Sequence, residues 1–471
     1  MIHHFKLVAA FLGLGFSLIV CLAGPAHGCS SFKLQKGTEL LYGHNLNQPR
    51  MDVPGQIFIN KRGVFKIGRS QADMLAKEGG TPSSLSWISR YGSVTFSTFG
   101  KDMPDGGINE AGLFIWEMSD ETEYPKNESL PRLIQMNWMQ FVLDNFATTE
   151  ETVASAGRIA IEGWGWHYFV GDADGRCAAI EFIKGEVVVH RGEDMPVPAL
   201  FNEPYAREME MARYFRGFGG LYEPNLDDRH VPRFVKTAAM IRDYDPSRPA
   251  AEYGLEMLDR IKVNETPDWS VLVDVRRKAF YFKTARNPEI KTFSEAGLDF
   301  SNLTPALVLN LDRKEGGDVL PLFHPATESE IRDFIHSLPL PEGFFAGMGL
   351  TRDEFAERFA THQRAAEDPA RQAFRGTWKT KPDEIKAPAS GAEISVELAV
   401  DGTAVSGSIR NNKGEDYALD HLHLIAGDLS FTFRNANGSF YFVRAALAGD
   451  RMDLQLGTID GVAARYVLHR Q

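Results

Sequence analysis

Apolar positions along the first three quarters of the chain follow both helical and strand-like spacing. Over Leu130–Ala147 the apolar residues stand three or four positions apart, which predicts a helix with one buried face. A second, N-capped helix is expected to begin at Thr149. Apolar or alternating runs at Ile180–Val189 and Ser270–Phe282 predict strands. Helices and strands are therefore both expected in this part of the chain.

From Gly376 onward the pattern changes to short strands separated by turns. The runs Ile394–Val400 and Thr403–Ile409 flank the dipeptide Asp401-Gly402, which strongly favours a hairpin. Further strand patterns lie at Leu422–Ile425, Asp428–Phe433, Ser439–Ala448, Arg451–Gly457 and Ala463–Leu468. Seven or eight strands at this spacing predict a small antiparallel barrel or sandwich.

The region ahead of these strands is expected to be helical. Patterns at Ala326–Leu338 and Thr351–Ala366 predict two helices, and a charged link follows at Glu367–Arg371. We therefore place a domain boundary here, with one domain over residues 29–370 and a small β-barrel-like domain over residues 371–471.

The first 28 residues have the pattern of a targeting segment. Lys6 is the only Lys, Arg, Asp or Glu among them, Leu7–Ala23 is mostly apolar, and Pro25 and small residues follow. This pattern predicts a secretory signal peptide over residues 1–28, cut after Gly28, and a secreted or periplasmic protein. An uncut anchor helix and a lipoprotein signal ending at Cys29 are the alternatives. After cleavage we expect no stable insertion into a membrane.

Composition narrows the classes of function. The 471 residues carry a net charge of −12, and no run of Lys and Arg exceeds three residues, so we expect no nucleic acid as a partner. Three cysteines in so long a chain exclude a disulfide-stapled scaffold and a four-cysteine zinc module. His421 and His423 share one strand face, but two ligands without a third do not predict a metal site. We expect neither a cofactor nor a metal ion.

Cleavage after Gly28 makes Cys29 the first residue of the chain. An N-terminal cysteine carries a thiol and a free α-amine, whose ordinary pKa of about 7.7–8.0 suits a base at neutral pH. A nucleophile and its base are then supplied by one residue. The other interpretation is that Cys29 merely follows a cleavage site. The second cysteine, Cys177, stands in an apolar strand pattern and is expected to be a buried structural residue.

A hairpin is expected directly after Cys29. Two strand-like runs flank Gln35-Lys36-Gly37. The second run continues into Gly43-His44-Asn45-Leu46-Asn47, whose polar groups can return beside the first residue. The sequence alone leaves the register of the two strands open.

These features resemble the choloylglycine hydrolase and penicillin V acylase family of N-terminal-nucleophile amide hydrolases. The likeness is a set of short motifs in the family's order over roughly Cys29 to Ser301. The motifs are Cys29-Ser-Ser-Phe, Gly43-His-Asn-Leu-Asn, Asp105-Gly-Gly-Ile-Asn-Glu-Ala-Gly-Leu, Phe169-Val-Gly-Asp-Ala-Asp-Gly, Phe201-Asn-Glu-Pro, Pro232-Arg-Phe-Val and Asp268-Trp-Ser-Val. Each motif is weak alone, and the ordered set is specific.

The resemblance implies an α+β fold and a set of catalytic roles. The fold is a four-layer αββα sandwich, in which two antiparallel sheets lie face to face with helices outside. Cys29 would attack the amide carbonyl, with its α-amine as base. Asn202 would donate its side-chain amide to the oxyanion, and the backbone N–H of Asn109 would be the second donor. Arg233 would be the site arginine, whose charge favours the thiolate.

The chain departs from the family at two motif positions. His44 stands where the family has arginine, and Asn47 stands where it has aspartate. Asn47 can still accept a hydrogen bond but carries no charge, so the α-amine would have a lower pKa than beside an aspartate. His44 would make the positive charge near the thiol depend on pH. One hypothesis is a retuned amidase, and the other is a site that binds ligand without turnover.

These observations favour a cysteine hydrolase of linear carbon–nitrogen amide bonds. Acyl transfer to another amine is a third possibility. The partner would be a small N-acyl amide, with penicillin V, N-acyl homoserine lactones, bile-salt conjugates and N-acyl amino acids all open, as is assembly into a homo-oligomer. Aromatic candidates for the walls of an acyl pocket are Phe58, Trp116, Trp164, Trp166 and Tyr168.

Overall fold

The predicted first hairpin is present. The computed structural model describes residues 28–47, 53–75, 83–263, 268–302, 304–360, 371–381, 393–401, 404–425, 428–458 and 461–471. Strands β1 (Ser30–Lys36) and β2 (Glu39–Leu46) pair antiparallel. Gly37 has a φ of 61° in the turn between them, a conformation that glycine adopts without a steric penalty.

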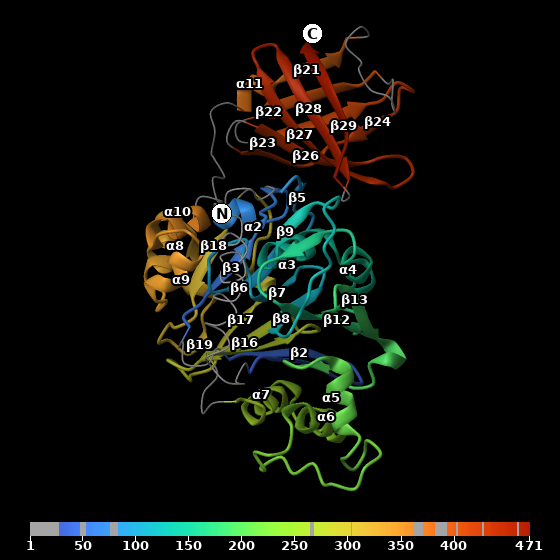
Figure 1. Cartoon of the computed structure of the whole chain (residues 1–471). Coiled ribbons are helices and arrows are strands. Elements are labelled where there is room, and N and C mark those ends of the chain that lie inside the picture. The colour runs from blue at the N-terminus through green and yellow to red at the C-terminus, as the bar shows by residue number, and fades with distance from the viewer. Residues whose placement is uncertain are drawn as a thin grey trace, which may run out of the picture.

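A seven-stranded sheet is built around this hairpin, in the order β14-β1-β2-β15-β16-β17-β19 (Figure 1). All neighbouring strands are antiparallel except β17 and β19, so the sheet is mixed. The predicted strand Ser270–Phe282 is in fact two strands joined by a turn. The further strands of this sheet are β14 (Ala199–Leu200), β15 (Trp269–Asp274), β16 (Ala279–Thr284), β17 (Lys291–Ser294) and β19 (Gly317–Asp318).

A second, nine-stranded sheet is antiparallel throughout, in the order β13-β12-β11-β8-β7-β6-β3-β18-β20. The predicted strand Ile180–Val189 is interrupted, because Lys184 and Gly185 adopt positive φ and reverse the chain. The strands are β3 (Gln56–Asn60), β6 (Ser93–Ser97), β7 (Gly106–Asn109), β8 (Phe114–Ser119), β11 (Trp166–Gly171), β12 (Cys177–Ile183), β13 (Glu186–Arg191), β18 (Leu307–Asn310) and β20 (His324–Pro325).

The two sheets touch through aromatic side chains of β2 and β8. The Tyr42 and Phe114 rings stack with centroids 4.9 Å apart, and the His44 ring stacks on Trp116 at 4.0 Å. Cys29 belongs to the core cluster that these side chains help to form. The nucleophile candidate is therefore held in a packed region and not on a loop.

Each sheet also contacts its own helices. α3 (Gln135–Asn145) and α4 (Thr149–Ser155) contact the nine-stranded sheet, while α6 (Arg233–Asp243) and α7 (Ala250–Arg260) contact the seven-stranded one, with α5 (Tyr205–Ala212) against α6 (Figure 1).

The helix predicted over Leu130–Ala147 begins later, because Arg132–Ile134 forms strand β9, which pairs in parallel with β10 (Ala160–Glu162). The helix predicted from Thr149 is confirmed, and Thr148 caps it in a reciprocal pair with Glu151.

Further elements complete this part of the chain. The helices predicted over Ala326–Leu338 and Thr351–Ala366 are present within narrower bounds, as α8 (Glu328–His336) and α10 (Arg352–Ala360). Their apolar residues join those of α3 and of the nine-stranded sheet in a second core cluster. The remaining elements are α2 (Gln71–Leu75), β4 (Phe65–Ile67), β5 (Ser86–Ile88) and α9 (Glu342–Gly347).

The last part of the chain forms one antiparallel sheet with its own core. Its order is β24-β23-β22-β21-β29-β28-β27-β26-β25, and contacts of β23 with β25 and of β24 with β26 bring its two ends together, so that it is barrel-like and nearly closed (Figure 1). It contains β21 (Gly376–Thr380), β22 (Ser395–Asp401), β23 (Ala404–Arg410), β24 (Asp416–Ala418), β25 (Asp420–Ile425), β26 (Asp428–Arg434), β27 (Phe440–Ala448), β28 (Arg451–Thr458) and β29 (Gly461–Arg470), preceded by α11 (Arg371–Phe374).

Several predictions fall on other residues. The leader pattern over residues 1–27 and most of the link at 367–371 lie outside the described residues, and the predicted domain boundaries stay predictions. Within the described part of the chain, no helix has the length and apolarity that a membrane crossing requires.

Candidate active site

Strand register brings Cys29 together with two asparagines. The β1–β14 pairing, continued past the strand ends, sets Cys29 opposite Asn202. The β1–β2 pairing, continued in the same way, sets Gly28 opposite Asn47. The polar end of the first hairpin therefore returns beside Cys29, as the sequence suggested.

Two side chains donate hydrogen bonds to the carbonyl that precedes Cys29. Asn47 Nδ2 lies 2.8 Å from the Gly28 oxygen, and Arg233 Nη1 lies 2.5 Å from the same atom. Arg233 Nη1 also lies 3.4 Å from the Cys29 carbonyl oxygen. Arg233 can reach both because it is the first residue of α6, at the end that faces β1. A carbonyl oxygen beside the thiol thus has two polar donors, one of them a cation.

Asn202 is held between Arg233 and the end of β8. Its Nδ2 donates to the Ser119 carbonyl oxygen at 2.8 Å, and its Oδ1 accepts from Arg233 Nη2 at 3.3 Å. One Nδ2 hydrogen is occupied by Ser119, which leaves the second for another acceptor. The role of Ser119 could not be predicted from the sequence. Its backbone oxygen makes the contact, and any residue type could supply that atom.

The Cys29 thiol is neutral in this environment. Only 1% of the residue is exposed, and this burial raises the pKa of the thiol well above its usual value, with the Glu117 charge adding to the effect. The Asn47 backbone N–H and the Arg233 charge lower the same pKa, but by less. A thiol of this kind needs a base before it can attack a carbonyl.

Arg233 remains a cation at neutral pH. Burial lowers its pKa to about 10, and the nearby Glu208 acts in the opposite direction. The guanidinium also lies over the Phe201 ring, 4.9 Å from its centroid. Most arginines lie on the surface or in salt bridges, whereas Arg233 is buried beside Cys29.

His44 does not act as predicted. Its Nδ1 lies 2.9 Å from Ser31 Oγ, its ring stacks on Trp116, and burial lowers its pKa well below 6.5. The imidazole is therefore neutral at pH 7, which contradicts the pH-dependent positive charge expected near the thiol. The strand alternation explains this, because the His44 ring faces the second sheet at a position directly across from Ser31.

Asn109 is also placed differently from the prediction. Its backbone N–H donates to the Leu113 oxygen at 3.0 Å, and its side chain bonds the Leu143 and Phe146 carbonyls and the Ala111 amide, among others. The N–H is therefore committed to a turn, which contradicts the second oxyanion donor assigned to it. Asn109 instead fixes the β7–β8 turn against the end of α3.

Two buried acids near Cys29 were missed from the sequence. Glu117 on β8 is fully buried, neither of its carboxyl oxygens has a hydrogen-bond partner in the described part of the chain, and burial raises its pKa well above 4.5. Asp268 is 8% exposed, accepts from the Val53 backbone N–H at 3.0 Å, and acts electrostatically on the Cys29 thiol. The β2–β15 register continues to set Asp268 opposite Asn47. Only the pairing of β2 with β15, which the sequence does not specify, reveals this neighbour.

Most of the proposed pocket walls lie elsewhere. Trp116 shares the core cluster of Cys29, whereas Phe58, Trp166 and Tyr168 belong to the second cluster and Trp164 packs against it. Alternation along a strand explains the difference, because neighbouring side chains point to opposite faces of the sheet.

Comparisons with known proteins agree with this geometry. No protein-family model matches the chain. The penicillin V acylase of Pectobacterium atrosepticum is 27% identical over an alignment of 266 residues that covers 46% of this chain and 69% of that enzyme. Among solved structures, the penicillin V acylase from Agrobacterium tumefaciens superposes with a TM-score of 0.55 at 23% identity, covering 64% of this chain and 98% of that one. A conjugated bile acid hydrolase from Clostridium perfringens (variant R18L) gives a TM-score of 0.48 at 17% identity, covering 62% and 99%.

The fold is thus similar to that of the Agrobacterium penicillin V acylase over 64% of this chain. The sequence likeness to the Pectobacterium enzyme agrees with the resemblance noted from the motifs. The chain is similar to penicillin V acylases, and this supports its resemblance to the choloylglycine hydrolase and penicillin V acylase family.

Proposed function

We propose that the protein is a secreted or periplasmic hydrolase of linear N-acyl amides, with Cys29 as nucleophile and the α-amine of Cys29 as base. The observation that carries this proposal is the convergence of Asn47 and Arg233 on the Gly28–Cys29 backbone, with Asn202 bonded to Arg233. Cutting the chain after Gly28 frees the amine and removes the carbonyl that the two donors hold. An acyl group could then occupy the place of that carbonyl.

A free α-amine would have a ready partner at Asn47. The Oδ1 of Asn47 is buried and has no hydrogen-bond partner in the described part of the chain. The α-amine of Cys29, neutral or protonated, can donate a hydrogen bond to this oxygen. This bond would orient the amine nitrogen beside the thiol. Asp268, across from Asn47, adds a negative charge that favours the ammonium form and so offsets the missing aspartate at position 47.

The proposed reaction has two steps. The α-amine takes the Cys29 thiol proton, Sγ attacks the amide carbonyl carbon, and the oxyanion forms. The carbon–nitrogen bond then breaks as the ammonium returns its proton to the leaving amine, which leaves a thioester on Cys29. Water, deprotonated by the same amine, hydrolyses this thioester and releases the acid.

Asn202 and Arg233 are the proposed oxyanion partners. The strand register sets Asn202 opposite Cys29 with one Nδ2 hydrogen free, and the Arg233 guanidinium already contacts the Gly28 and Cys29 carbonyls. Both side chains are already held in place, Asn202 by its hydrogen bond to the Ser119 carbonyl and Arg233 by its position at the start of α6. Neither must therefore reorganise as negative charge develops. Arg233 thus replaces the Asn109 backbone N–H as the second oxyanion partner beside Asn202.

We also propose the four-layer αββα arrangement as the scaffold. The helix contacts of each sheet, together with the ring contacts between β2 and β8, support it. The two-sheet core then positions Cys29 directly before β1.

The neutral thiol and the uncharged Asn47 favour a second function, ligand binding without turnover. The two functions differ in whether an acyl-enzyme forms. We therefore propose to express the full chain in its own host, sequence the N-terminus of the exported protein, and assay it against penicillin V, an N-acyl homoserine lactone, a bile-salt conjugate and an N-acyl amino acid. Hydrolysis abolished by Cys29→Ala supports the enzyme, whereas binding with no acid product from any amide supports the binding protein.

A further inference from the structure

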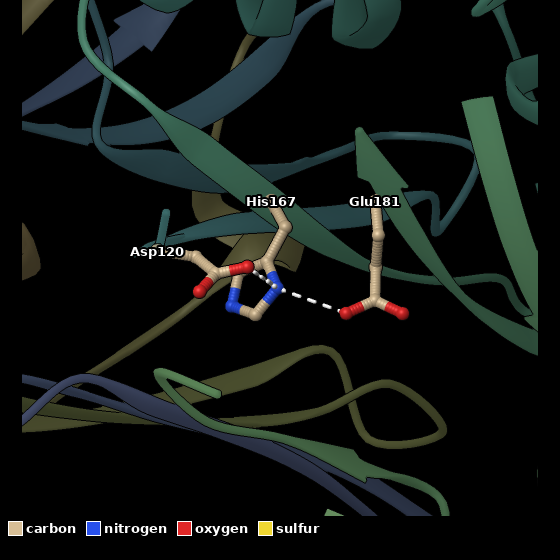
Figure 2. A group of neighbouring side chains, drawn as sticks. All are labelled: Asp120, His167 and Glu181. Atoms are coloured by element: carbon tan, nitrogen blue, oxygen red, sulfur yellow. Dashed lines mark hydrogen bonds and ion pairs between the residues drawn. The ribbon is translucent and has the colours of Figure 1, made fainter. Parts of the chain in front are cut away.

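Three side chains on neighbouring strands form a buried cluster directly behind Asn202. His167 of β11 lies opposite Glu181 of β12, and Asp120 follows the end of β8 (Figure 2). His167 and Glu181 are fully buried, and one ligand atom from each of the three lies within 4.8 Å of the others.

The backbone fixes which nitrogen of His167 carries a proton. Nε2 lies 2.5 Å from the Phe201 carbonyl oxygen, and a carbonyl only accepts, so Nε2 must be the protonated nitrogen. Nδ1 therefore points at the carboxylates, 3.2 Å from Glu181 Oε1 and 3.5 Å from Asp120 Oδ2. An imidazole held by one N–H on a backbone carbonyl, with its other nitrogen free, is the arrangement usual for a metal-binding histidine.

Three acceptor atoms cannot face one another in a buried site without a proton or a metal ion between them. The proton would lie on Nδ1 or on a carboxyl oxygen. The separations from Nδ1 are 3.2 Å, which a hydrogen bond allows, and 3.5 Å, both longer than the roughly 2.7–2.9 Å typical of charge-assisted bonds. Both separations also fit ligands that each lie about 2.0–2.2 Å from one shared ion.

We propose that Asp120, His167 and Glu181 bind one divalent transition-metal ion of the zinc type. One imidazole nitrogen and two carboxylate oxygens suit zinc and its neighbours better than calcium, which prefers oxygen ligands alone. The neighbours support the ligand set, because the Tyr205 backbone N–H donates to Glu181 Oε1 at 2.9 Å and His190 Nε2 lies 3.2 Å from Glu181 Oε2.

The site would connect the two segments that hold Asn202. Asp120 directly follows Ser119, whose carbonyl accepts from Asn202, and the carbonyl bonded to His167 belongs to Phe201, the residue before Asn202. The ion would brace this corner of the fold. No spacing motif in the sequence marks these ligands, because they come from three separate segments of the chain, and the proposal differs from the expectation of a metal-free protein.

The test measures metal binding and does not depend on hydrolysis. The untagged protein is stripped with a chelator and dialysed, then titrated with Zn²⁺ by calorimetry and with Co²⁺ by visible absorption. We expect one ion per chain, with a micromolar or lower Kd, and a higher Tm in its presence. Asp120→Asn, at the more exposed edge of the cluster, should weaken binding at least tenfold, and Glu181→Gln should weaken it further.

A matched control is available on the surface. His324 Nε2 and Glu330 Oε1 form an exposed histidine–carboxylate pair at 2.8 Å, and His324→Gln should leave the stoichiometry and Kd unchanged. The proposal is overturned if wild-type protein binds neither ion stoichiometrically, or if Asp120→Asn binds as tightly as wild type. A ¹⁵N spectrum with both His167 nitrogens protonated in excess Zn²⁺ would also overturn it, by identifying the cation as a proton.

Discussion

Asn47 Nδ2 donates to the carbonyl oxygen of Gly28 at 2.8 Å, so the second strand of the first hairpin contacts the peptide bond that precedes Cys29. The other atom of the same amide, Oδ1, is buried without a partner in the described part of the chain. Asn47 is thus placed to hold the chain before cleavage and to accept from the α-amine afterwards.

Asn47→Asp should shift the acid limb of the kcat/KM profile to higher pH. A carboxylate at this position favours the ammonium form of the α-amine, raises its pKa, and so requires a higher pH for the free base. Asn127→Asp, in an exposed turn where Oδ1 accepts from the backbone N–H and the hydroxyl of Ser129, is the control and should leave the profile unchanged. An acid limb indifferent to Asn47→Asp would show that position 47 does not face the amine.

Asp268→Asn should shift the same limb in the opposite direction. Removing the negative charge across from Asn47 disfavours the ammonium and lowers the amine pKa. The Asn oxygen can still accept from the Val53 N–H, so the loop should keep its position. A limb that moves to higher pH, or not at all, would remove Asp268 from the account.

Asn202→Ala should lower kcat by about 10²–10³, the usual effect of losing one oxyanion donor. KM should change little, because the donor acts mainly on charge that develops during the reaction. Steady-state rates on the best amide of the panel measure both constants. A kcat within threefold of wild type would mean that the oxyanion lies elsewhere.

Asn109→Ala should instead destabilise the fold and spare the chemistry. The change removes side-chain bonds to the Leu143 and Phe146 carbonyls and leaves buried groups unsatisfied, at a cost of about 1–3 kcal/mol for each. Denaturant unfolding should show the loss, while kcat per folded molecule stays near the wild-type value. A fall in kcat to match Asn202→Ala, with unchanged stability, would restore the role first assigned to Asn109.

Asp105 should make stability depend on pH. Burial raises its pKa from 3.8 to about 7, so its contribution to stability is present below about pH 4 and is lost as pH rises through 7. A shift of about three pKa units corresponds to about 4 kcal/mol. Asp105→Asn can keep the bond from the Thr98 N–H. Its free energy of unfolding, relative to wild type, should therefore rise between pH 4 and pH 8, and a flat difference would contradict the buried-acid interpretation.

The sequence predicted helices and strands better than it predicted the contacts of individual side chains. The first hairpin, the helix from Thr149 and the strands of the last hundred residues follow from local turn and cap signals, and all are present. The return of Asn47 beside Cys29 also followed, because one hairpin connects them. These features depend on residues close together in the chain.

Contacts between distant strands could not be predicted in the same way. Which face His44 occupies, which N–H of the Asn109 turn is free, and which acid lies across from Asn47 depend on register between strands far apart in sequence. A shift of one residue along a strand moves a side chain to the opposite face of the sheet. Four of the aromatic residues expected to line the acyl pocket lie in or against the second core cluster, away from Cys29.

The most direct test of the central claim compares two forms of the same protein, one beginning at Cys29 and one extended by Gly28. Each is mixed with the best amide of the panel, and intact and peptide mass spectrometry measure acyl adducts on Cys29 alongside release of the amine. The account predicts a thioester on Cys29 and turnover only in the form that begins at Cys29, because the extension removes the base and leaves a buried, neutral thiol. Equal turnover by both forms, or an adduct on Cys177 alone, would contradict it.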